Sequence, residues 1–156
     1  MAFAFVFPGQ GSQSVGMMAA YGDAAVVRAT FDEASTALGQ DLWALVAEGP
    51  TEALAQTVNT QPVMLTAAVA AWRLWQEKGG RLPAVVAGHS LGEYSALVAA
   101  GVIAFKDAVP LVRLRASAMQ EAVPLGTGGW PRSWASTTTA CALPVSKLLP
   151  ARLSKQ

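Results

Sequence analysis

Short apolar runs alternate along this chain with longer segments of helical spacing, and the alternation predicts an α/β fold. Ala2–Phe7 and Ala84–Ala87 are apolar throughout, and each run lies next to a proline. Short continuous apolar runs bounded by turn residues are typical of strands buried in a parallel sheet. We therefore expect both runs to be buried strands.

The longer segments carry helix start and stop signals. The predicted helical segments are Met17–Leu38 with a break near Gly22, Asp41–Gly49, Thr51–Gln56, Thr60–Lys78, Leu91–Ala100 and Asp107–Val123. We expect Asp41 and Thr51 to act as N-caps, and Pro62 to lie in the first turn of its helix, where a missing N–H costs nothing. The order of strand, helices, strand, helices indicates a parallel sheet with flanking helices.

Composition narrows the class of protein. With 156 residues, 53% of them hydrophobic and 13% charged, the chain has enough apolar material for one domain. A net charge of +1 gives no reason to expect a nucleic-acid or membrane-surface partner. The single cysteine, Cys141, fits a reducing compartment, and the N-terminal run lacks the basic segment of an export signal. These features predict a cytoplasmic protein without a membrane span.

The stretch Gly88–Gly92, which reads GHSLG, has the spacing of a strand-to-helix elbow. Two glycines flank Ser90 at i−2 and i+2, so the backbone can turn sharply and leave the serine oxygen at the tip. The helix that follows presents unpaired N–H groups and a positive dipole end at the same place. Ser90 is thus a candidate nucleophile beside a ready site for a developing oxyanion.

His89, the only histidine of the sequence, directly precedes this serine. Neighbouring side chains at the end of a strand point to opposite sides, so His89 is poorly placed to take the proton of Ser90. We expect His89 to be a packed, hydrogen-bonded side chain under the elbow. The general base must then come from elsewhere.

Arg115 falls on the apolar face of the last predicted helix, among Leu111, Val112 and Met119. A guanidinium there needs a partner, because an unpaired buried charge is costly. One interpretation is a structural ion pair or a side chain that reaches out to solvent. The other is a planar fork for a substrate carboxylate. Arg113 is expected to be an ordinary residue of the solvated face.

Four segments in order resemble one known family. They read FVFPGQGSQ, NTQPVMLTAAVA, GHSLGEYSALVAAGV and LVRLRASAMQEAVPLGTGG, and they span about Phe3 to Gly129. Together they closely resemble the malonyl-CoA:acyl-carrier-protein transacylases of fatty acid synthesis.

This resemblance implies a role for several residues. Ser90 would attack malonyl-CoA, form a malonyl-serine ester and pass the malonyl group to the phosphopantetheine thiol of acyl carrier protein. The N–H groups of Leu91 and Gln10 would form the oxyanion hole, Arg115 would bind the malonate carboxylate, and Gln61 would line the site. For Gln10 and Gln61, loop capping and helix-start hydrogen bonding remain open as alternatives. No metal and no cofactor are expected beyond malonyl-CoA as substrate and the carrier's phosphopantetheine.

The resemblance also implies features that this sequence lacks. The family's base is a histidine well downstream, beyond a small ferredoxin-like subdomain, in chains roughly double this length. Residues 1–129 would therefore be a partial acyltransferase domain, with an exposed strand edge and apolar face, and with impaired transfer. Two other functions remain open: an esterase-like hydrolase, which would turn over aryl esters without malonyl-CoA, and an inert truncated product.

Residues 130–156 differ in character from the rest, since all 10 acidic residues lie before Gly129. The family is expected to continue from GTGG with a segment whose GC-rich coding sequence, after loss of one nucleotide, translates to the residues Trp130–Thr139. We therefore interpret residues 130–156 as a frame-shifted, poorly ordered tail. Resequencing the DNA across codon 129 tests this hypothesis.

Overall fold

The computed structural model describes residues 2–122 and 143–144. Its elements are, in chain order, β1 (Ala4–Phe7), the 3-10 helix η1 (Ala19–Tyr21), α1 (Ala25–Leu38), α2 (Leu42–Glu48), α3 (Thr51–Ala55), α4 (Thr57–Glu77), β2 (Val85–Gly88), α5 (Leu91–Ala99), α6 (Phe105–Ala122) and β3 (Leu143–Pro144). The predicted boundary at Gly129, Cys141 and the proposed frame-shifted tail lie outside the described residues, apart from residues 143–144.

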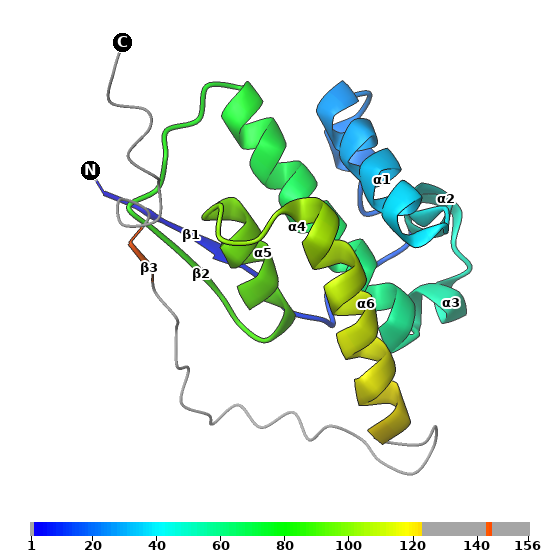
Figure 1. Cartoon of the computed structure of the whole chain (residues 1–156). Coiled ribbons are helices and arrows are strands. Elements are labelled where there is room, and N and C mark those ends of the chain that lie inside the picture. Colours follow the sequence, from blue (N-terminus) through cyan, green and yellow to red (C-terminus); the bar gives the residue numbers. More distant parts are fainter. Residues whose placement is uncertain (1, 123–142, 145–156) are drawn as a thin grey trace.

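The predicted α/β class is confirmed. Strands β1 and β2 pair in parallel, with Ala4 opposite Val85 and Phe7 opposite Gly88, and β3 adds an antiparallel pair on the other side of β2. Figure 1 shows the strands together at one side of the molecule and the helices beside them. Because β1 and β2 are parallel neighbours, their carboxyl ends meet at one edge of the sheet, where open α/β sheets hold ligands.

The expectation that both strands are buried is only half right. Phe7 and Val86 are buried against Trp72 of α4 and Ala96 of α5. Val6, however, is 67% exposed. Successive side chains of a strand point to opposite faces, and in the described part of the chain α4 and α5 pack on the face that carries Phe7. This leaves an apolar side chain of β1 exposed.

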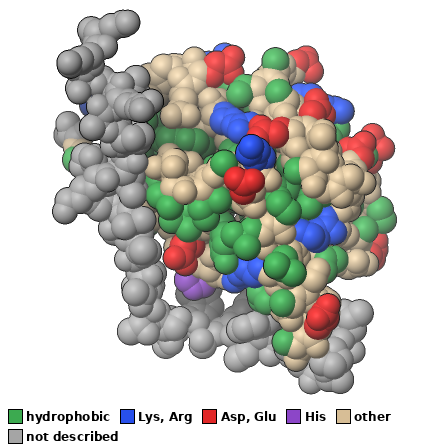
Figure 2. All heavy atoms as spheres, in the orientation of Figure 1, with side chains coloured by type: hydrophobic (Ala, Val, Ile, Leu, Met, Phe, Trp, Pro, Cys, Tyr) green, Lys and Arg blue, Asp and Glu red, His purple; other side chains and the backbone are tan. Residues whose placement is uncertain are grey.

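A second, larger core lies between helices. Phe31 of α1, Leu65 of α4 and Val109 of α6 are fully buried in it. These helices pack against one another, with α4 also contacting α5, so α4 connects the two cores (Figure 1). No helix of the described residues has the length and apolar character to cross a membrane. On the face shown in Figure 2, positive and negative side chains are interspersed, in keeping with the small net charge.

Helix α4 begins three residues earlier than the sequence pattern predicts, at Thr57 instead of Thr60, so Pro62 lies inside the helix. Side-chain contacts with the preceding helix stabilise this early start. Thr60 Oγ1 donates to the Leu54 carbonyl at 2.5 Å, and Asn59 Nδ2 donates to the Ala53 carbonyl at 2.9 Å. Tertiary contacts thus outweigh the missing N–H of the proline.

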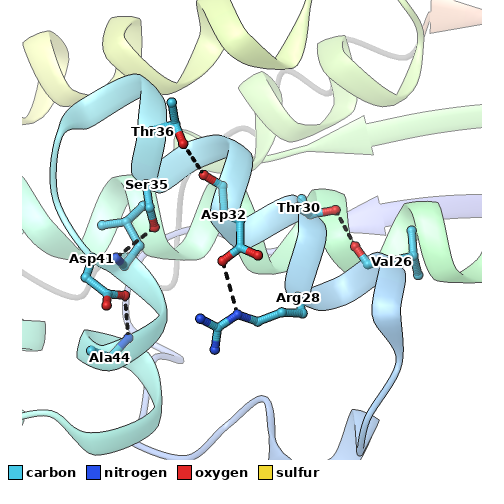
Figure 3. Close-up of polar contacts among 9 residues, drawn as sticks. Val26, Arg28, Thr30, Asp32, Ser35, Thr36, Asp41 and Ala44 are labelled. Carbon is cyan, nitrogen blue, oxygen red and sulfur yellow. Dashed lines mark hydrogen bonds and ion pairs between the residues drawn. The ribbon is translucent and has the colours of Figure 1, made fainter.

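The two predicted N-caps have different outcomes. The Asp41 carboxylate accepts a hydrogen bond from the Ala44 N–H at 2.8 Å and caps α2, as predicted (Figure 3). Thr51 is instead the first residue inside α3, and Pro50 occupies the N-cap position without a side-chain bond. The prediction for Thr51 was therefore wrong, because proline at the preceding position sets the extended conformation of a cap by itself.

The remaining boundaries differ in detail. Met17–Leu38 contains η1 and α1, separated at Gly22, whose φ is 56°. α6 begins at Phe105, two residues before the predicted Asp107, because Phe105 is itself buried in the helical core.

Candidate functional site

The peptide between β2 and α5 forms the predicted elbow. Ser90 has φ 55° and ψ −112°, and it is the one described non-glycine residue with a positive φ. A Cβ at Gly88 would overlap the Gly92 carbonyl, and a Cβ at Gly92 would overlap the Phe7 carbonyl. Glycine is therefore required on both sides of the serine. Ser90 itself has the strained backbone conformation and is exposed at the tip of the turn.

The first turn of α5 uses two of its backbone N–H groups to close the elbow. The Gly92 N–H is bonded to the His89 carbonyl at 2.9 Å and the Glu93 N–H to the Ser90 carbonyl at 3.2 Å. Leu91 is the first residue of the helix, directly after the serine, and its side chain is buried. Its N–H is thus a donor at the positive end of the helix dipole.

Arg115 of α6 reaches this elbow from a distant part of the sequence. Its Nη2 donates to Ser90 Oγ at 3.0 Å, and its Nη1 donates to Gln61 Oε1 at 2.7 Å. The guanidinium carbon lies 5.7 Å from the ring centroid of Tyr94 on α5, a cation–π contact. Of the two interpretations left open for Arg115, a structural ion pair is not found in the described residues, and the guanidinium points to the candidate nucleophile.

Gln61 of α4 lies behind the arginine and is fully buried. Its Oε1 accepts from Arg115, and its Nε2 donates to the sulfur of Met119 at 3.3 Å. Neither bond belongs to the start of α4, so the helix-start alternative for Gln61 does not describe its contacts. The structure brings Ser90, Arg115 and Gln61 together.

The loop that follows β1, residues 8–13 with the sequence PGQGSQ, lies next to the elbow. A Cβ at Gly9 would lie 3.1 Å from the His89 carbonyl, so the loop backbone touches the residue before Ser90. The exposed side chain of the next residue, Gln10, donates to Thr57 Oγ1 at 3.3 Å, and the Gly11 N–H bonds to the Gln13 side chain at 2.8 Å. Gln10 is therefore near the elbow, and its side chain connects the loop to α4.

The prediction for His89 was wrong. The residue is exposed, and in the part of the chain that the structure describes its side chain makes no hydrogen bond. The backbones of Phe7, Gly88 and Gly92 approach one another closely at the turn and leave no room there for the imidazole. As expected, no side-chain hydrogen bond joins His89 to Ser90 within the described residues, and Ser90 Oγ accepts from Arg115.

The prediction for Arg113 was also wrong. It is half-buried, and its Nη2 donates to Gln40 Oε1, whose amide in turn donates to Asn59 Oδ1 at 3.1 Å. Burial lowers the pKa of Arg113, because desolvation penalises the charged form. Leu111, assigned to the apolar face, is 41% exposed. The buried stripe of α6 is rotated toward Val109 and Val112, because α1 and α4 pack there.

Comparison with known proteins adds to this geometry. The profile of the acyl transferase domain family matches residues 4–143. The chain belongs to this family. It is 66% identical over 128 residues to the malonyl CoA-acyl carrier protein transacylase of Salmonella typhimurium, an alignment covering 81% of this chain and 41% of that protein. The chain thus spans about two-fifths of the length of the curated relatives it matches.

Solved structures of the acyl transferase family have the same fold. The acyl-carrier-protein S-malonyltransferase of Burkholderia pseudomallei superposes with a TM-score of 0.78 at 70% identity, over 80% of this chain and 40% of that one. A malonyl-transacylase in complex with its type II PKS acyl-carrier protein superposes with a TM-score of 0.77 at 63% identity, again over 80% and 40% of the chains.

Sequence reasoning missed the parts that Tyr94 and Met119 take in this cluster. Tyr94 follows Ser90 by four residues on α5, and Met119 follows Arg115 by four residues on α6. Residues four apart on a helix share a face, so this spacing was the signal that could have found Met119. Tyr94 lies in the first turn of the helix that follows Ser90, and this position was the signal for it.

Proposed function

We propose that the chain forms the nucleophile-bearing part of a malonyl-CoA:acyl-carrier-protein S-malonyltransferase of fatty acid biosynthesis. The names of the relatives and the bond between Arg115 Nη2 and Ser90 Oγ, 3.0 Å long, support this proposal. The cation beside the nucleophile is the observation that carries it, because an acyl group with a free carboxylate gives that cation a partner.

In the proposed reaction Ser90 Oγ attacks the thioester carbon of malonyl-CoA. The new C–O bond forms, the C–S bond breaks, and coenzyme A leaves as the thiol with the serine proton. The phosphopantetheine thiol of an acyl carrier protein then attacks the serine ester, and the hydroxyl of Ser90 is restored. Both steps pass through a tetrahedral oxyanion, for which the N–H groups of Leu91 and Gln10 are the proposed donors.

Arg115 is the proposed specificity residue. A guanidinium binds a carboxylate through two parallel N–H···O bonds, which fixes the acyl group as well as attracting it. Its present bonds to Ser90 and Gln61 hold it within reach of an acyl group on the serine. The same feature disfavours an esterase for neutral esters, since such a substrate offers nothing to this cation.

We expect removal of the Ser90 proton to limit the rate at which the 156-residue polypeptide is acylated. Its one histidine, His89, is exposed, and the hydroxyl of Ser90 is bonded to Arg115, which has no acceptor. Without a base, serine attack loses much of its rate, although the oxyanion donors and binding leave residual reactivity. We therefore propose slow acylation by this polypeptide. Its cytoplasmic location also remains a prediction.

The test is acylation of the purified chain by malonyl-CoA, followed by intact mass and by peptide mapping. We expect a malonyl group at Ser90 that accumulates over minutes to hours. Ser90→Ala should abolish it, and Ser14→Ala, which changes an exposed serine of the PGQGSQ loop region, should not. Labelling at other residues, or equal labelling of the Ser90→Ala chain, would refute the proposed nucleophile. Complete labelling within seconds would refute the proposed lack of a base.

A further inference from the structure

The buried amide of Gln61 connects Arg115 to a residue that has no assigned part in the site, Met119. Gln61 is fully buried, so its amide has no access to water. Its oxygen accepts from Arg115 Nη1 at 2.7 Å, and its nitrogen donates to Met119 Sδ at 3.3 Å. Each end of the amide therefore depends on the residue it faces.

The chemistry of these side chains permits one orientation of the amide. A guanidinium carries only donors, so the side of Gln61 that faces Arg115 must be its oxygen. The amide nitrogen must then face the other neighbour, Met119. A thioether sulfur is an acceptor and has no proton, so it suits a donor and would be a poor partner for the amide oxygen.

Met119 and Arg115 lie four residues apart on α6 and so share one face of the helix. The same helix face thus contacts Gln61 twice, once with a donor and once with an acceptor. An amide held at both ends cannot turn over, and its oxygen then holds Nη1 of Arg115 while Nη2 reaches Ser90. The Tyr94 ring, 5.7 Å from the guanidinium carbon, limits the arginine from the side of α5.

We propose that Met119 is a positioning residue for Arg115. Its sulfur orients the Gln61 amide, and the amide oxygen holds the guanidinium beside the nucleophile in the position in which it binds an acyl carboxylate. This inference rests on the proposed function. Its consequence is specific: loss of the sulfur acceptor weakens binding of a substrate that carries a carboxylate and leaves binding of an uncharged acyl group unchanged.

Two substitutions separate this role from simple packing. Met119→Leu keeps the apolar volume and removes the acceptor, so Gln61 Nε2 is left without a partner and the amide is held only at its oxygen end. Met119→Gln keeps the length of the side chain and supplies a carbonyl oxygen to the same donor. Leu114→Ala is the matched control, since Leu114 is on the same helix and 67% exposed.

The measurement is binding of malonyl-CoA and of acetyl-CoA by isothermal titration calorimetry, expressed as the ratio of the two dissociation constants. We expect the unchanged chain to prefer malonyl-CoA. Met119→Leu should lower this preference about fivefold through malonyl-CoA alone, the size expected for the loss of a single hydrogen bond. Met119→Gln should restore most of the preference, and Leu114→Ala should leave it unchanged.

The outcomes distinguish this inference from the proposed function. If the unchanged chain binds both thioesters equally, the proposed function fails. If it prefers malonyl-CoA and Met119→Leu preserves that preference, the role of Met119 fails and the proposed function stands. If Met119→Leu does not fold, the test is made on the unchanged chain by NMR. A nuclear Overhauser effect between the Met119 methyl group and the Gln61 amide protons supports the inference, and its absence overturns it.

Discussion

Arg115 Nη2 donates a hydrogen bond to Ser90 Oγ at 3.0 Å, although the two residues lie 25 positions apart in the sequence, one in the elbow before α5 and the other on α6. The contact joins the residue at the strained tip of the elbow to the residue that the amphipathic pattern of α6 cannot explain. Ser90 gives the guanidinium a hydrogen-bond acceptor, and Arg115 places a positive charge beside the serine hydroxyl. A serine nucleophile with a cation beside it suits an acyl group that ends in a carboxylate.

The backbone strain at Ser90 predicts an unusual stability order. A non-glycine residue with φ 55° and ψ −112° carries a conformational cost that glycine does not. Ser90→Gly should therefore be more stable than Ser90→Ala by about 1 kcal/mol, measured as the free energy of unfolding in urea. Equal stability of the two variants would show that the elbow is unstrained.

The close approach of the backbone at Gly92 predicts a strong effect of a single methyl group. A Cβ there would overlap the Phe7 carbonyl, so Gly92→Ala should lower the free energy of unfolding by about 3 kcal/mol as β1 and α5 move apart. Gly79→Ala is the control, because Gly79 has a positive φ of 74° and open space around its Cβ position. Gly79→Ala should lower the free energy of unfolding by only about 1 kcal/mol. Similar losses for both would contradict the packing described here.

The cap of α2 predicts a smaller effect. Asp41→Ala removes the acceptor of the Ala44 N–H and should lower the free energy of unfolding by about 1 kcal/mol. Asp41→Asn keeps a side-chain oxygen and should retain most of that energy. A Thr51→Ala change, at the position that the sequence wrongly suggested as a cap, should have less effect than Asp41→Ala.

The network around Arg113 predicts that Gln40 stabilises the start of α4. Gln40→Ala removes the acceptor of Arg113 Nη2 and the donor to Asn59 Oδ1, and it should lower the free energy of unfolding by about 1 kcal/mol. Gln76→Ala, an exposed glutamine of α4, is the matched control and should change stability little. If Gln40→Ala also leaves the free energy of unfolding unchanged, the hydrogen bonds of Gln40 make no net contribution to stability.

Local rules predicted the parts of the fold that depend on neighbouring residues. The GHSLG spacing located the elbow, the short apolar runs located both parallel strands, and the predicted helix ending at Lys78 located the end of α4 to within one residue. Each of these signals acts over a few residues.

Contacts between distant residues decided the rest. Gln40 and Arg113 are 73 positions apart, and nothing near either residue indicates their bond. Likewise, the early start of α4 follows from side chains that reach back to α3, against the signal of Pro62. For the site, the motifs identified Ser90, Gln61 and Arg115, but the sulfur contact that orients the Gln61 amide became visible only with α4 and α6 packed together.

The central claim, that Arg115 makes the Ser90 site selective for a carboxylate-bearing acyl group, is tested most directly by competition. The chain is incubated with equal concentrations of malonyl-CoA and acetyl-CoA, and the two acyl groups on Ser90 are counted by mass spectrometry. We predict that malonyl exceeds acetyl at least about tenfold, and that Arg115→Gln reduces the excess to near parity while acetyl labelling persists. Equal malonyl and acetyl labelling of the unchanged chain would contradict the claim.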